Sequence, residues 1–119
     1  MNDIVFSDLQ AFASCVNDYF GSDEEYARFT RMLVENPQAG DVIVGACRAR
    51  KVRYPDVIHR KGTRGGLRVI YFYFPQFATI TCVAIYRKSE KVDLTVQEKR
   101  AICVLSDKLL AIEANKRKG

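Results

Sequence analysis

Cationic side chains crowd the stretch between positions 48 and 68, which is the part of the sequence best suited to chemistry. This stretch holds eight lysines and arginines against a single acid, Asp56. The net charge of +5 is local, because residues 1–41 carry two basic and eight acidic side chains. A localised positive field attracts polyanions; we expect an RNA backbone, although an acidic protein could use the same field. The cations are Arg48, Arg50, Lys51, Arg53, Arg60, Lys61, Arg64 and Arg68.

The residue pattern places these cations on two paired strands. Side chains alternate around positions 51–54, so Lys51 and Arg53 share one strand face while Val52 and Tyr54 share the other. Three glycines between positions 62 and 66 predict a hairpin turn rather than a phosphate cradle, since no helix follows them directly.

Further strands and helices must position this hairpin. Residues 67–74 and 79–86 are rich in β-branched and aromatic residues on both faces, which predicts central strands covered on two sides and joined by a turn at 75–77. An apolar segment at 4–6 predicts a short edge strand.

Three capping boxes predict helices: Ser7 with Gln10, Ser22 with Glu25, and Thr95 with Glu98. The first helix is expected to end at Gly21 and the second before Asn36-Pro37, as an antiparallel helical hairpin. The last helix is expected to bury an apolar face made of Ile102, Leu105, Leu109 and Ile112. The sequence therefore predicts one α+β domain over residues 1–119, with the helical hairpin and the last helix packed on a small antiparallel sheet.

The cysteines carry no recognisable site signature. Cys15, Cys47, Cys82 and Cys103 lie far apart without a C-x-x-C pair, so we expect buried reduced thiols, no disulfide, and no metal or cofactor. No signal peptide or apolar run of membrane-spanning length is present, and we expect a cytoplasmic protein.

Four strings in register resemble the RelE/HigB superfamily of bacterial toxins from toxin–antitoxin systems, and its HigB-like branch in particular. The strings are NPQAGDVI at 36–43, RKVR at 50–53, RGGLRVIY at 64–71 and YRKSEKVDL at 86–94. The resemblance covers roughly residues 20–100. It implies a RelE-like fold and a ribosome-dependent mRNA endonuclease that contacts rRNA. It also implies neutralisation by a cognate HigA-like antitoxin with a helix-turn-helix DNA-binding domain.

Metal-independent cleavage of RNA needs a deprotonated 2′-hydroxyl and cations around the phosphate that it attacks. Arg53 and Arg68 are expected to hold that phosphate, because guanidinium groups bind phosphate oxygens in a bidentate fork. Lys51 is the proton-transfer candidate, on the expectation that surrounding cations and partial burial lower its pKa. Lys88 adds a fourth cation from the other side of the cleft. The remaining predicted RNA contacts are Arg48, Arg50, Arg60, Lys61, Arg64 and Arg87.

Other roles are less defined by the sequence. We expect Arg68 to be an exposed strand-end cation whose loss would leave folding intact. The general acid or stacking group is unassigned among Tyr54, Tyr71, Tyr73 and Tyr86, since relatives place an arginine and an aromatic where Ser89 and Thr95 stand. His59 lies in a loop that is longer than in close relatives, where an exposed histidine without a catalytic role is the commoner case.

Two alternatives of another class stay open. A ParE-like relative would bind DNA gyrase and cut nothing, although it has no need of a phosphate-facing trio such as Lys51, Arg53 and Arg68. A degenerate module would bind RNA or its antitoxin without a proton-transfer group.

Overall fold

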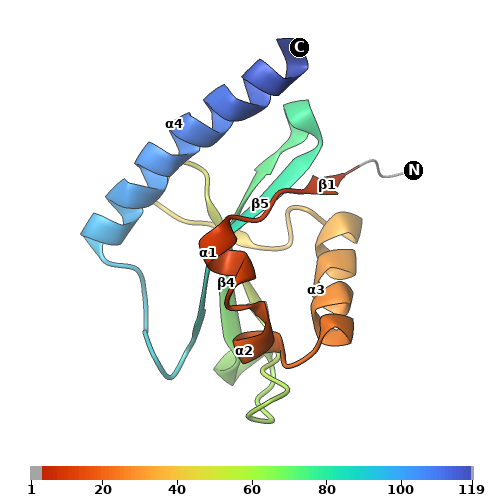
Figure 1. The fold of residues 1–119 in the computed structure, drawn as a ribbon. Helices are drawn as coiled ribbons and strands as arrows, with labels where there is room; N and C mark the ends of the chain where they lie inside the picture. The colour runs from red at the N-terminus through yellow and green to blue at the C-terminus, as the bar shows by residue number, and fades with distance from the viewer. Residues whose placement is uncertain (1–3, 119) are drawn as a thin grey trace.

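The computed structural model describes residues 4–118 as an α+β fold with a five-stranded, mostly antiparallel sheet (Figure 1). The strand order is β1-β5-β4-β3-β2, and only the β1–β5 pair is parallel. Among the described residues, no helix has the length and apolar character to cross a membrane. The elements are β1 Val5–Phe6, α1 Gln10–Ala13, α2 Val16–Phe20, α3 Asp23–Glu35, β2 Asp41–Val42, β3 Arg50–Tyr54, β4 Leu67–Phe74, β5 Thr79–Arg87 and α4 Val96–Lys118, with short 3-10 turns at Thr63–Gly65 and Pro75–Phe77.

The central strand β4 is buried on both faces, as its apolar pattern predicted. Its alternate side chains enter two separate cores. Leu67, Val69 and Tyr71 pack with the N-terminal helices, whereas Ile70 and Phe72 pack under α4. The predicted edge strand at 4–6 and the turn at 75–77 are likewise confirmed.

The predicted first helix is wrong as a single element, because it divides into α1 and α2. The N-cap of α1 is Leu9, which makes no side-chain cap, so the Ser7–Gln10 capping box does not form. At the break, the Ser14 hydroxyl donates to the carbonyl of Ala11 at 2.9 Å. Side chains that bond to the local backbone in this way compete with helix continuation. The predicted stop at Gly21 is confirmed, since Gly21 ends α2 in the left-handed conformation at φ 85°.

The other two helix starts are confirmed in different degrees. The Ser22 side chain accepts from the Glu25 N–H at 3.1 Å, but the Glu25 carboxylate binds Arg28 and Tyr54 instead of returning to Ser22. Thr95 and Glu98 form the full reciprocal box, with distances of 2.8 and 3.1 Å.

The apolar stripe of α4 differs from the predicted one in its last member. Ile102 and Leu109 are buried, but 49% of Ile112 is exposed. Ser106 and Glu113 are buried instead, and Glu113 pairs with Lys116 at 3.0 Å. The spacing 102, 106, 109 and 113 follows the helical repeat, so the sheet selects a face that includes two polar residues.

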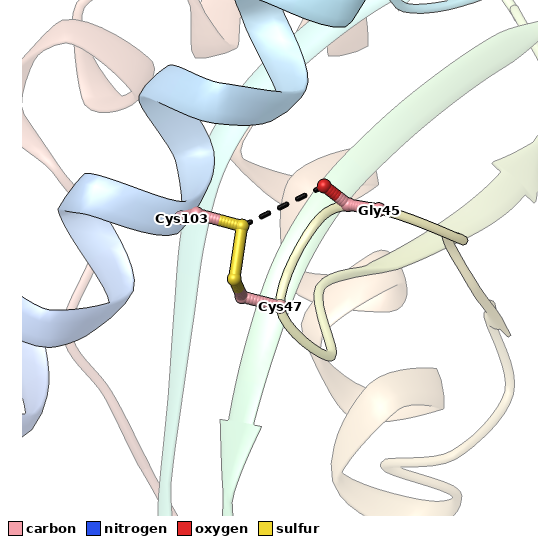
Figure 2. The surroundings of a disulfide bond; sticks show 3 residues. All are labelled: Gly45, Cys47 and Cys103. Atoms are coloured by element: carbon pink, nitrogen blue, oxygen red, sulfur yellow. Dashed lines mark hydrogen bonds between the residues drawn. A yellow bond between two sulfur atoms is a disulfide. The ribbon is translucent and has the colours of Figure 1, made fainter.

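The expectation of four reduced thiols is wrong. Cys47 and Cys103 form a disulfide across 56 residues (Figure 2). Cys82 is a buried free thiol, and Cys15 is free and partly exposed. The Cα atoms of the bonded pair are 5.2 Å apart, within the range that a disulfide needs. Only the tertiary packing of α4 against the loop between β2 and β3 brings these two cysteines together.

The predicted hairpin between β3 and β4 is confirmed, but its tight turn lies at residues 57–60, and Gly62 and Gly66 flank a 3-10 turn instead. The strands pair in antiparallel register and residues 55–66 join them, with an additional bridge between Asp56 and Lys61. Gly66 is buried where three backbone segments meet. A Cβ there would lie 2.4 Å from the carbonyl oxygen of Tyr54 and 2.7 Å from that of Gly62.

Gly66→Ala is therefore expected to lower the free energy of unfolding by more than about 2 kcal/mol, because backbone atoms cannot move aside cheaply. Gly62→Ala is the matched control, since a Cβ at Gly62 meets nothing within 4 Å. Its effect is expected to stay within about 0.5 kcal/mol. Urea unfolding of both variants measures the difference, and equal stability of the two would show that the close approach at Gly66 is not a constraint.

Candidate functional site

A row of three polar side chains crosses the sheet on the face that α4 covers. Arg53 of β3 lies opposite Arg68 of β4, and Arg68 lies opposite Tyr86 of β5. Residues that oppose each other in neighbouring strands point to the same side of the sheet. Lys51, two residues before Arg53, shares this face. The fold thus brings together three of the four predicted catalytic cations.

Lys51 also has a carboxylate neighbour. Its Nζ lies 3.6 Å from Oδ1 of Asp93, which belongs to the segment between β5 and α4. A hydrogen bond from the Leu94 backbone, aided by the charges of Lys51 and Lys99, lowers the pKa of Asp93. Asp93 is therefore ionised at neutral pH, and Lys51 does not have the purely cationic surroundings that we expected.

The outer edge of β3 borders two adjoining pockets. One has a volume of about 290 Å³ and extends to Ile43, Val44 and Lys99; the other, of about 520 Å³, extends along Val52–Pro55. Asp41, Lys51 and Arg53 line both. β2 pairs only with Arg50 and Lys51 of β3. The outer edge of β3 after Lys51 is therefore unpaired and borders these pockets.

Arg68 is not the exposed cation that we expected. Only 6% of its surface is exposed, and its guanidinium donates to the carbonyls of Thr63, Arg64 and Leu67 at 2.9 to 3.1 Å. Burial, together with repulsion from Arg53, lowers the pKa of Arg68. Its side chain fastens the hairpin loop to the sheet, so removing it would disturb the fold as well as any bound ligand.

Arg53 provides the accessible guanidinium of the row. It is exposed, and within residues 4–116 no carboxylate lies within ion-pair distance of either Arg53 or Arg68. Two adjacent guanidinium groups without a counter-ion repel each other. An anion bound beside Arg53 would relieve that repulsion.

Of the four candidate tyrosines, Tyr86 is the one that lies in the cation row. The hydroxyl of Tyr54 donates to Glu25 and that of Tyr71 donates to the Pro37 carbonyl, both at 2.7 Å. The Tyr86 hydroxyl is buried without a hydrogen-bond partner among the described residues, and Lys91 lies over its ring at 5.8 Å. Burial, reinforced by Asp93, raises the pKa of Tyr86, so its phenol stays protonated and is able to donate.

The other predicted contact residues separate into different regions. Arg50 lies on the opposite face from Lys51, where it donates to the Gly40 carbonyl at 2.7 Å. Together with Arg48 it lines a separate pocket of about 340 Å³. Lys88 is exposed, and its backbone N–H donates to the Gly66 carbonyl at 3.0 Å. The hairpin loop carries three further predicted RNA contacts, all exposed: Arg60, Lys61 and Arg64.

Arg87 belongs to a cluster that the sequence did not reveal. Its Nε donates to buried Asp56 at 2.8 Å, its Nη2 donates to the Asp18 carbonyl at 2.8 Å, and its guanidinium stacks on Tyr19 at 4.5 Å. These contacts make Arg87 a link between β5, α2 and the hairpin loop. The only available signal was Asp56 itself, the single acid in the cationic stretch.

Asp56 also binds His59, the only histidine. Its Oδ2 lies 2.9 Å from Nδ1 of His59, and its Oδ1 accepts the His59 backbone N–H at 3.2 Å. Burial disfavours the charged carboxylate, but the hydrogen bonds from Arg87 and His59 outweigh it and lower the pKa of Asp56. The side chain of His59 is exposed, as expected, and Asp56 fixes its position in the loop.

This site is suited to binding an anion. It combines an exposed guanidinium, a lysine in a shallow pocket, a second guanidinium beneath them and a protonated phenol. Cations at this spacing on one face attract phosphate oxygens and stabilise charge that develops on them.

No protein-family model matches this chain.

Asp56→Asn is expected to lower the free energy of unfolding by about 1–3 kcal/mol at pH 7, because Arg87 loses its buried counter-charge. Since folding lowers the pKa of Asp56, its contribution is present above the ordinary aspartate value of about 3.9 and is lost as pH falls below it. Urea unfolding at pH 7 and pH 3 should show the gap between wild type and variant narrowing in acid. A gap that is unchanged at pH 3 would contradict the assigned pKa direction.

Proposed function

We propose that this protein is a ribosome-dependent mRNA endonuclease that inhibits translation and is neutralised by a cognate antitoxin. The observation that supports it most is the row of Arg53, Arg68 and Tyr86 beside Lys51, at the edge of a pocket and on the strands that carry the RelE/HigB-like strings. Three predicted catalytic cations, separated by up to 17 positions in the chain, occupy one face of the sheet.

In this proposal Arg53 binds the scissile phosphate directly, because it is the exposed guanidinium of the row. Arg68 supports it from below by adding positive charge and by fixing the loop at Thr63 and Arg64. Stabilisation of developing phosphorane charge by preorganised donors is a large contribution to catalysis. The Tyr86 phenol is placed to donate a further hydrogen bond once the segment containing Lys91 moves from its ring.

Lys51 remains the candidate for proton transfer. The 2′-hydroxyl of the RNA passes its proton to the Lys51 amine as the 2′-oxygen bonds to phosphorus, and the bond from phosphorus to the 5′-oxygen breaks. The upstream fragment keeps a 2′,3′-cyclic phosphate, and the departing 5′-oxygen takes up a proton from water. An incoming phosphate competes with Asp93 for Lys51, since both are anions and Asp93 is exposed.

The outer cations extend the interface beyond the scissile phosphate. Arg60, Lys61 and Arg64 on the hairpin loop are proposed to contact rRNA or flanking mRNA phosphates, together with Arg48 and Lys88. Such contacts position a nucleic acid without reading its sequence. The proposed antitoxin is a helix-turn-helix protein, and the proposed compartment is the bacterial cytoplasm.

Induced expression in a bacterial host, followed by sequencing of mRNA 5′ ends, tests the function. Wild type is expected to arrest growth and produce new 5′ ends within translated codons, whereas Lys51→Ala/Arg53→Ala should lower their yield at least about 100-fold. Lys108→Ala, an exposed cation on α4 outside the pockets, is the matched control and should behave as wild type. Arrest without mRNA cleavage would favour a gyrase-binding protein, and absence of arrest would favour a degenerate binding module.

Asp93→Asn is expected to raise the affinity for single-stranded RNA about two- to threefold, since it removes a competing anion from an exposed and therefore weak ion pair. Fluorescence anisotropy at two salt concentrations measures this change, and the gain should shrink as salt rises. Weaker binding by Asp93→Asn would show that RNA does not replace Asp93 at Lys51.

A further inference from the structure

The disulfide lies next to the pocket that contains Lys51 and Arg53. Cys47 belongs to the loop between β2 and β3, which supplies Ile43 and Val44 to one wall of the pocket. Cys103 is on α4, four residues after Lys99, which supplies the opposite wall. Residues four apart share one side of a helix. The disulfide therefore ties α4 to the loop between β2 and β3 (Figure 2), the two segments that supply these walls of the pocket.

This loop has a conformation that needs support. Cys47 and Arg48 have φ values of 55° and 72°, in the left-handed region that costs free energy for residues other than glycine. Gly45, with φ 84°, lies against the Lys99 stem, to which a Cβ at Gly45 would come within 3.7 Å. Consecutive strained residues persist only when the surroundings hold them.

The backbone hydrogen bonds of the loop are local. Its backbone hydrogen bonds run from Ile43 to Ala49, from Ala46 to Ile43 and from Ala49 to Ala46, at 2.8 to 3.2 Å. Ala46 and Ala49 are buried under α4, and both are small. The strand that precedes the loop, β2, pairs with only two residues, Arg50 and Lys51. The covalent bond to α4 is thus the strongest link between this wall of the pocket and the rest of the fold.

A reductant can reach this bond, because Cys47 is exposed and Cys103 is partly exposed. A thiolate of a dithiol reductant attacks Cys47 Sγ, the S–S bond breaks, and Cys103 leaves as a thiolate that takes up a proton. The second thiol of the reductant then displaces Cys47. In total two electrons and two protons pass from the dithiol, which becomes a disulfide. The reduced Cys103 thiol then has a proton to donate to the Gly45 carbonyl, 3.6 Å from its sulfur.

We propose that the Cys47–Cys103 disulfide is a redox latch that regulates the candidate nuclease site. In the oxidised protein it holds the loop and β2 in place beside Lys51, so the site is ready for RNA phosphate. Reduction releases Cys47 and Arg48 from their left-handed conformations and loosens the wall of the pocket, which weakens RNA binding. This proposal rests on the proposed function for its RNA readout, but the release of the loop is measurable without RNA.

Hydrogen exchange of the purified protein tests the release. The amides of Ile43, Ala46 and Ala49 are expected to exchange at least about tenfold faster after treatment with dithiothreitol, while those of β4 keep their protection. The Cys47→Ser/Cys103→Ser variant should match reduced wild type in either condition. Identical loop exchange in oxidised and reduced wild type would overturn the latch.

Binding of a short fluorescein-labelled single-stranded RNA tests the regulation. Oxidised wild type is expected to bind about fivefold more tightly than reduced wild type, because the released loop must be ordered again on binding. Cys15→Ser should keep this difference, since Cys15 is outside the disulfide. Cys47→Ser/Cys103→Ser should bind equally in both conditions.

The two readouts separate the possible failures. Equal RNA affinity in both redox states, with loop exchange still redox-dependent, would overturn the regulation and leave the proposed function intact. No RNA binding in either state by a folded protein would overturn the proposed function, and the regulation of a nuclease with it.

Discussion

The antiparallel register of β3, β4 and β5 is the constraint on which the candidate site depends. It places Arg53 opposite Arg68 and Arg68 opposite Tyr86, on the face toward α4. A slip of one residue would turn every side chain of a strand to the other face of the sheet. Such a slip is strongly opposed, because β4 is buried on both faces between two cores. The apolar residues of β4 thus determine where its one cation points.

That placement carries an electrostatic cost. Arg68 is desolvated and faces Arg53 without a carboxylate in ion-pair range among the residues described, and three backbone carbonyls supply its acceptors. On the opposite face of the sheet, the carboxylate of Asp56 neutralises the charge of Arg87. The partly buried Arg87 has a counter-charge within the chain. The buried Arg68 instead lies opposite Arg53, which lines two pockets that an external anion could occupy. A bound phosphate would complete the second arrangement as Asp56 completes the first.

Much of the fold and of the candidate site could be predicted from local sequence patterns. The remainder depends on how deeply each side chain is buried and on packing between segments far apart in the sequence. Alternation at 51–54 correctly assigned Lys51 and Arg53 to one face, and the reciprocal Thr95–Glu98 cap was visible in the sequence. The alternation of side chains along a strand tells which face of the sheet a residue occupies, but not how deeply the residue is buried. The expectation that Arg68 is exposed was therefore wrong. The Cys47–Cys103 pair has no characteristic spacing. Residues 7–21 matched a helical period, yet the helix is interrupted near Ser14, whose hydroxyl donates to the Ala11 carbonyl.

The chemical identity of the cleaved RNA ends tests the central claim most directly. Purified protein would be added to ribosomes translating a defined mRNA, and the same mRNA with a single 2′-deoxy nucleotide before the mapped cut would be the comparison. Attack by the 2′-hydroxyl at a phosphate held by Arg53 and Lys51 predicts a 2′,3′-cyclic phosphate on the upstream fragment. It also predicts that the 2′-deoxy substitution abolishes the cut. Cleavage that persists in the 2′-deoxy mRNA, or no cleavage of either mRNA, would contradict the account.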